Sequence, residues 1–162
     1  MKTNRYNLAA ACVLNGIMFG IAKLFYEVVP VPMHNLLYCS FLGFTVTSAT
    51  NPEMNSIPKL LASMGAGLVW VGGYILFEYM FLKLPITPMV SKAVAFGLMS
   101  FLIEVLNTQY LRKTPFQCIP LQFAVVIAMF SQQCHNIMLV LVALIIGVIM
   151  ALLSKRIYMR LG

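Results

Sequence analysis

Charged side chains are scarce in this chain, and acidic side chains are the scarcest. Only 9% of the 162 residues are charged, and the acidic residues are four glutamates with no aspartate. A soluble domain carries about 25% charged residues, so the composition argues against a protein that is surrounded by water. The sequence also lacks a G-x-S-x-G nucleophile motif, an H-E-x-x-H zinc motif and a glycine-rich phosphate loop. These absences predict that the chain is not an enzyme and uses no cofactor.

Metal-ligand spacings are missing as well. The four cysteines show no paired C-x-x-C spacing of the kind that holds zinc; they stand at Cys12, Cys39, Cys118 and Cys134. We expect buried thiols that behave as small hydrophobic side chains and predict no metal site.

Long apolar stretches make up most of the chain. Hydrophobic residues account for 61% of the sequence, and the mean hydropathy is +0.90. A membrane helix needs ~20 mostly apolar residues, so a single domain over residues 1–162 has room for about six spans. The apolar runs place them near residues 8–28, 34–50, 59–82, 90–110, 118–133 and 136–157. The sequence therefore predicts an all-α polytopic membrane protein with about six transmembrane helices.

The boundary between the fifth and sixth spans is weak, because only residues 132–136 separate them. One long kinked helix is the alternative. A helix of about 40 residues is too long for a single crossing of a ~30 Å hydrocarbon core, which favours two spans.

Lysine and arginine are distributed unevenly between the two sides that these spans define. Eight would lie on the side of both termini and two on the opposite side, while Lys23 lies inside the first span. Because cytoplasmic segments carry the excess of basic residues, both termini are expected in the cytoplasm. The basic residues stand in ones and twos at span ends, so the net charge of +7 does not indicate a nucleic-acid partner.

Matching residues recur at a nearly constant spacing. The matches are Gly16-Ile17-Met18 with Gly97-Leu98-Met99, 81 residues apart, Phe41 with Phe123, 82 apart, and Gly67 with Gly147, 80 apart. Two repeats of three helices are predicted, over about 8–83 and 90–157. Since three is odd, the second repeat would enter the membrane in the opposite orientation. Inverted repeats of this kind recur in transporters.

Some of these residues carry a resemblance to a known family. They are Phe41-Leu42-Gly43, Gly67-Leu68-Val69-Trp70, Pro120 with Phe123, and the helix around Gly147. Over roughly residues 10 to 155 the chain resembles the YcdZ-like small bacterial inner-membrane proteins. It departs from them at Asn51-Pro52-Glu53, where that family has glycines and a lysine, and at Leu121, where it favours glycine. The resemblance implies an inner-membrane, multi-pass location and no activity, because the family is a domain of unknown function.

Lys23 and Glu104 are charged residues inside predicted spans, and they stand 81 residues apart. Charge within a bilayer costs at least ~2.5 kcal/mol on insertion scales, so each needs a partner or a wet cavity. They are candidates for lining a polar pathway. The alternative pairs Lys23 with Glu27 one turn away and lets Glu104 reach Arg112 or the cytoplasmic interface.

Polar residues end the second and fifth spans, on opposite sides of the membrane. Thr47, Asn51, Gln132 and Gln133 are the candidates there for lining a solute path. They could equally be span ends that meet lipid headgroups.

Small residues at four-residue spacing permit close helix contacts, within the chain or between copies. The candidates for helix packing are Gly16, Gly20, Ser63, Gly67 and Gly147. Six short spans barely enclose a path, so a homo-oligomer is expected.

Two functions are compatible with these observations. One is a channel or transporter for a small polar solute. The other is a structural or accessory membrane protein that binds another integral protein and conducts nothing.

Overall fold

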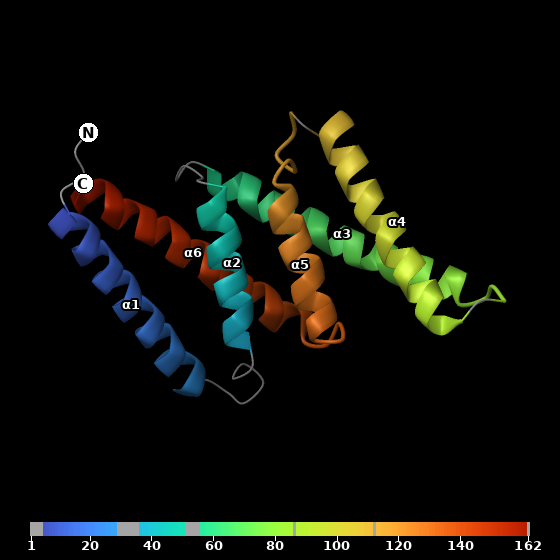
Figure 1. Ribbon diagram of the computed structural model, residues 1–162, viewed down its shortest axis with the longest axis horizontal. Coiled ribbons are helices and arrows are strands. Elements are labelled where there is room, and N and C mark those ends of the chain that lie inside the picture. Colours follow the sequence, from blue (N-terminus) through green and yellow to red (C-terminus); the bar gives the residue numbers. More distant parts are fainter. Residues whose placement is uncertain (1–4, 29–35, 51–55, 86, 112, 162) are drawn as a thin grey trace. The chain divides into compact units, whose positions relative to one another are not determined.

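The computed structural model describes residues 5–28, 36–50, 56–85, 87–111 and 113–161. Within these ranges the backbone forms helices and no strand. The helices are α1 (Arg5–Val28), α2 (Leu37–Ala49), α3 (Ile57–Phe81), α4 (Pro88–Gln109), α5 (Ile119–Ser131) and α6 (Ile137–Leu161) (Figure 1). Each lies within a few residues of a predicted apolar run, and the last two runs form two helices rather than one kinked helix.

Three of the described helices are long and apolar enough to cross a membrane: Ile57–Phe81, Pro88–Gln109 and the Ile137–Arg160 part of α6. Large apolar side chains such as Val69, Phe101 and Met138 are exposed on their surfaces, as expected where lipid replaces water. These features are those of an α-helical membrane protein.

The helices α2 and α5 are shorter than the spans predicted there, with 13 residues each. At a rise of 1.5 Å per residue they are ~20 Å long, less than a ~30 Å hydrocarbon core. Beyond α5, Gln133, Cys134 and Asn136 have φ of 51°, 56° and 53°. A right-handed helix cannot continue through left-handed backbone, so the fifth helix stops before its polar end.

The helices divide into two compact units, and each is described by itself. Unit 1 comprises residues 1–54 and 131–162, with α1, α2 and α6. Unit 2 comprises residues 55–130, with α3, α4 and nearly all of α5. The units differ from the sequence halves 8–83 and 90–157, because the third helix of each half packs with the first two helices of the other.

In unit 1, α2 packs against α6 through two glycines. A Cβ atom on Gly43 would lie 2.5 Å from the carbonyl oxygen of Leu144, and one on Gly147 would overlap the carbonyl oxygen of Ser40. Only glycine permits this approach of the two backbones. The α1 helix joins through Phe19, whose ring stacks on that of Phe41 with 4.5 Å between the centroids.

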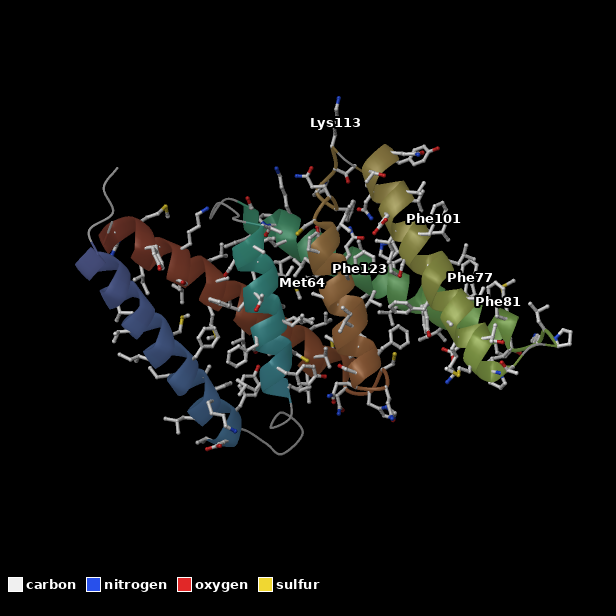
Figure 2. The ribbon with its side chains drawn as sticks, in the orientation of Figure 1. Met64, Phe77, Phe81, Phe101, Lys113 and Phe123 are labelled. Carbon is white, nitrogen blue, oxygen red and sulfur yellow. The ribbon has the colours of Figure 1, made fainter. Side chains whose placement is uncertain are left out.

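In unit 2, α3 and α4 form a helical hairpin. Its core is Tyr74, Ala95 and Met99, and Figure 2 shows Phe77 and Phe81 beside α4 near the turn. An ion pair between the Lys92 Nζ and Glu78 Oε1 atoms, 3.4 Å apart, joins the two helices.

The α5 helix packs on α3 at Gly67. A Cβ atom on this glycine would lie 2.7 Å from the Cβ of Val125 and 3.0 Å from the carbonyl oxygen of Gln122. Gly67 therefore sets the distance between α3 and α5.

Candidate functional site

A buried hydrogen-bonded group joins the three helices of unit 1. The hydroxyl oxygens of Tyr26 and Ser40 are 2.6 Å apart, and the Ser40 hydroxyl donates to the Ala143 carbonyl oxygen at 2.7 Å. Tyr26 and Ser40 are each 1% exposed. The group satisfies polar atoms that could not find partners in lipid.

A second buried group joins the three helices of unit 2 around Gln122, which is fully buried. Its side-chain oxygen accepts hydrogen bonds from Asn107 at 3.0 Å and from the Trp70 indole at 2.8 Å. Its side-chain nitrogen donates to the Asn107 side-chain oxygen at 2.9 Å and to the Phe116 carbonyl oxygen. The network therefore crosslinks α3, α4 and α5.

Our sequence reasoning did not single out these buried polar residues. The signal for Gln122 was present, since it is an amide within an otherwise apolar run. A polar side chain there requires a partner, but the sequence does not say which helix supplies it.

A pocket of about 350 Å³ lies between α2 and α6 in unit 1. Its lining includes three apolar side chains, those of Phe44, Ala151 and Leu152. It also includes hydroxyl groups and one cation, and the residues that provide them are Thr47, Ser48, Ser154, Lys155 and Tyr158. An apolar wall with a few polar groups is the usual make-up of a small-molecule site.

Thr47 is the unusual member of this pocket. It is 1% exposed, and its hydroxyl has no hydrogen-bond partner within the residues the structure describes. The neighbouring threonines differ. The Thr45 hydroxyl donates to the Phe41 carbonyl oxygen at 2.8 Å, and the Thr50 hydroxyl donates to the backbone carbonyl oxygen of Thr47 at 2.9 Å. A buried hydroxyl without a partner costs free energy, so the pocket presents an unfilled hydrogen-bonding position.

Gln132 and Gln133 lie away from Thr47 in unit 1. Gln132 lies in the α5–α6 turn and donates to the Tyr38 hydroxyl at 2.8 Å, near the opposite end of α2. Gln133 is exposed in the same turn, and its carbonyl oxygen contacts the His135 ring at 2.9 Å. Asn51 lies outside the described residues. Of the three described positions, Thr47 lines the pocket and Gln132 and Gln133 do not.

Lys23 forms a local ion pair. Its Nζ atom lies 2.9 Å from the Glu27 Oε1 atom, and both side chains are 56% exposed. Glu104 is exposed on α4 of unit 2, and its carboxylate joins no ion pair in the described ranges. Arg112, the partner considered for Glu104, lies outside those ranges.

The residues predicted to pack helices fall into two groups. Gly67 and Gly147 lie at helix contacts, and Ser63 accepts a hydrogen bond from the Cys118 amide at 3.2 Å. Gly16 and Gly20 differ, because a Cβ atom on either would meet nothing within 4 Å. At both glycines this face of α1 is open in the described part of the chain.

Among the described residues, no three His, Cys, Asp or Glu side chains lie close enough together to hold a metal ion. No protein-family model, curated protein or solved structure matches the chain.

Proposed function

We propose that the chain is a six-helix membrane transport protein for a small polar solute, built from two inverted repeats. One observation carries the proposal: the buried contacts of unit 1 and unit 2 correspond at the spacings of the sequence repeat. The correspondence supports the architecture, and the architecture together with the pocket supports the transport function.

Burial corresponds helix by helix. The helices α2 and α5 both have 13 residues, and α3 and α6 both have 25. Each buried residue of α2 has a buried counterpart 82 residues later, and each buried residue of α3 has one 80 residues later. The pairs are Cys39 and Leu121, Ser40 and Gln122, Gly43 and Val125, Thr47 and Met129, Leu60 and Val140, Ser63 and Ala143, Met64 and Leu144, Gly67 and Gly147, Val71 and Ala151, and Tyr74 and Ser154.

The buried hydrogen bonds correspond as well. Tyr26 bonds Ser40 in unit 1, and Asn107 bonds Gln122 in unit 2. Asn107 follows Tyr26 by 81 residues, and Gln122 follows Ser40 by 82. The chemistry differs between a hydroxyl pair and an amide pair, while the positions are the same. A paired polar contact at the repeat spacing supports the duplication.

The repeats exchange their third helices. Because α2 belongs to the first repeat and α6 to the second, the pocket at Thr47 lies where the two repeats meet. Transporters with inverted repeats bind their solutes at the repeat interface, on interrupted or short helices. A helix of ~20 Å that starts at one face ends within the membrane, so the end of α2 would present Thr47 at that depth.

In the proposed orientation, both termini lie on the cytoplasmic side of a bacterial inner membrane. The first turn of α1 and the last turn of α6 lie at the same end of unit 1 (Figure 1). Arg156 and Arg160 stand near the end of α6, which suits the cytoplasmic side.

Contact between copies is proposed on the open face of α1. Gly16 and Gly20 provide a smooth surface on which another helix could pack closely. The same face favours the second candidate function, an accessory protein that binds a different membrane protein. A Gly16→Leu, Gly20→Leu variant should lower the mass of a homo-oligomer in detergent and leave an accessory monomer unchanged.

The transport proposal is tested in proteoliposomes. Flux of urea, glycerol, ammonium, butyrate and phosphate is measured against protein-free vesicles, with Ser154→Tyr as a pocket-filling variant and Thr45→Val as a control. We expect flux of at least one solute, reduced by Ser154→Tyr and unchanged by Thr45→Val. No flux above protein-free vesicles would end the transport proposal in favour of the accessory function. Flux that Ser154→Tyr leaves unchanged would remove the pocket from the pathway.

A further inference from the structure

We propose that the pocket between α2 and α6 binds an oxyanion, a carboxylate or phosphate group attached to an apolar part. This inference deepens the proposed function and rests on it for the membrane setting of the pocket. It rests on the hydroxyl of Thr47, the sign of charge in the pocket, the apolar wall and a comparison with unit 2.

The polar side of the pocket is rich in hydrogen-bond donors. The Thr47 hydroxyl has a proton to donate and no acceptor in the described part of the chain. Ser154, which is 7% exposed, adds a second hydroxyl from α6. Lys155 contributes an ammonium group, which donates only. A group made of acceptor oxygens complements all three.

The charge of the described lining has one sign. Among the described residues that line the pocket, none is acidic and Lys155 is cationic. Hydrogen bonds that join a charged donor to an anion are about twice as strong as neutral ones. The pocket therefore favours an anionic acceptor over a neutral one such as an alcohol.

The apolar lining residues determine what the oxyanion is attached to. Phe44, Ala151 and Leu152 offer no side-chain hydrogen bond and suit a hydrocarbon part. A volume of about 350 Å³ lies at the small end of ligand sites. A short-chain carboxylate fits this description, and so does the phosphate group of a lipid with the first part of its chains.

At the corresponding position of unit 2, the described side chains are buried. Under the proposed repeat, Thr47 corresponds to Met129 and Ser154 to Tyr74, which are buried side chains. The Tyr74 ring contacts the Phe130 ring with 4.2 Å between centroids. The helix crossing is therefore compatible with a filled core, and the polar hollow is a feature of unit 1 that packing does not require.

The experiment separates the two sources of the oxyanion. The full chain is purified in dodecyl maltoside and an amine buffer with chloride, so that no carboxylate or phosphate is present. Sodium butyrate and sodium phosphate form the soluble arm. Phosphatidylglycerol in the micelles forms the lipid arm, with digalactosyl diacylglycerol as its uncharged control. Binding is measured by the shift in melting temperature and by titration.

We expect at least one arm to raise the melting temperature of the natural chain. Thr47→Val and Lys155→Gln should each weaken binding about tenfold or more, as for the loss of a hydrogen bond to a charged group. Thr45→Val should bind normally. Without ligand, Thr47→Val should melt no lower than the natural chain, because valine removes an unpaired buried hydroxyl; Ser154→Ala serves as a second binding variant.

Each outcome decides the proposal. A response in the soluble arm alone identifies a free anion, and one in the lipid arm alone identifies a lipid headgroup. No response in either arm, or equal responses in Thr47→Val and the natural chain, would overturn the site. Binding that Lys155→Gln leaves unchanged would overturn the anionic class. Oxyanion binding without flux in vesicles would support the site and end the transport proposal. Flux of a neutral solute without oxyanion binding would overturn the site and support the transport proposal.

Discussion

At the scale of single residues, the helix contacts of both units depend on glycines at positions where a side chain would not fit. Gly43 and Gly147 bring α2 and α6 together, and Gly67 brings α3 against α5. Within a membrane, such packing replaces the hydrophobic effect as the main attraction between helices. The polar side-chain contacts between these helices then form because the backbones are already close.

Gly67 can be tested against a neighbour on the same helix. A Cβ atom at Gly67 would lie 2.7 Å from the Val125 Cβ, whereas one at Gly65 would meet nothing within 4 Å. Gly67→Ala should destabilise the protein by about 1–3 kcal/mol, the usual cost of overpacking. Gly65→Ala should be neutral or stabilising by up to about 1 kcal/mol, because alanine is the better helix former. Unfolding in detergent measures both, and equal effects would argue against the α3–α5 contact.

At the scale of helices, a buried polar pair joins two neighbouring helices in each unit. Tyr26 and Ser40 fasten α1 to α2, and Asn107 and Gln122 fasten α4 to α5. Buried pairs of this kind fix the register of two apolar helices, which could otherwise slide along each other at little cost.

The pair in unit 2 allows a double-mutant cycle. Asn107→Leu removes two hydrogen bonds from the fully buried Gln122 and should cost about 1–3 kcal/mol. Gln122→Leu should cost a similar amount, since it leaves Asn107 and the Trp70 indole without their partner. The double variant should lose less than the sum, with an interaction energy of at least ~0.5 kcal/mol. Additive losses in chemical unfolding would show that the amides do not act as a pair.

Helix positions were predictable because apolar runs and prolines mark them strongly. The lengths of α2 and α5 were not predictable. As judged from the sequence, the polar residues as far as Asn51 and Gln133 could each continue a helix. Small-residue spacing singled out Gly67 and Gly147, which lie at helix contacts, but also Gly16 and Gly20, where a Cβ atom would meet no described atom within 4 Å. The partners of Gln122 and the pocket at Thr47 depend on which helices become neighbours, and apolar runs of similar composition do not specify that. The contact between Lys23 and Glu27 is an exception, because residues four apart on one helix lie side by side.

At the scale of the whole molecule, orientation is the most direct expectation. Reporter fusions after Arg160 and within residues 85–89 should report the cytoplasm and the exterior respectively, as the distribution of lysine and arginine predicts. The enzymatic activity of paired reporters on each side of the membrane measures this. Both fusions on one side would rule out six spans and the inversion together.

The two compact units, together with the proposed exchange of third helices, predict how the chain can be divided. Unit 2 is one continuous segment, residues 55–130, and contains its own core and the Gln122 network. Expressed alone, this segment should insert and resist proteolysis.

The sequence halves 1–85 and 87–162 should each be degraded alone. The first contains α2 without α6 and the second contains α6 without α2, which leaves the surfaces of Gly43 and Gly147 without partners. Co-expression of the two halves should restore a protease-resistant complex, seen as co-purification through a tag on either half. If each half were stable by itself and residues 55–130 were not, the compact units would be the contiguous halves, and the exchange would be wrong.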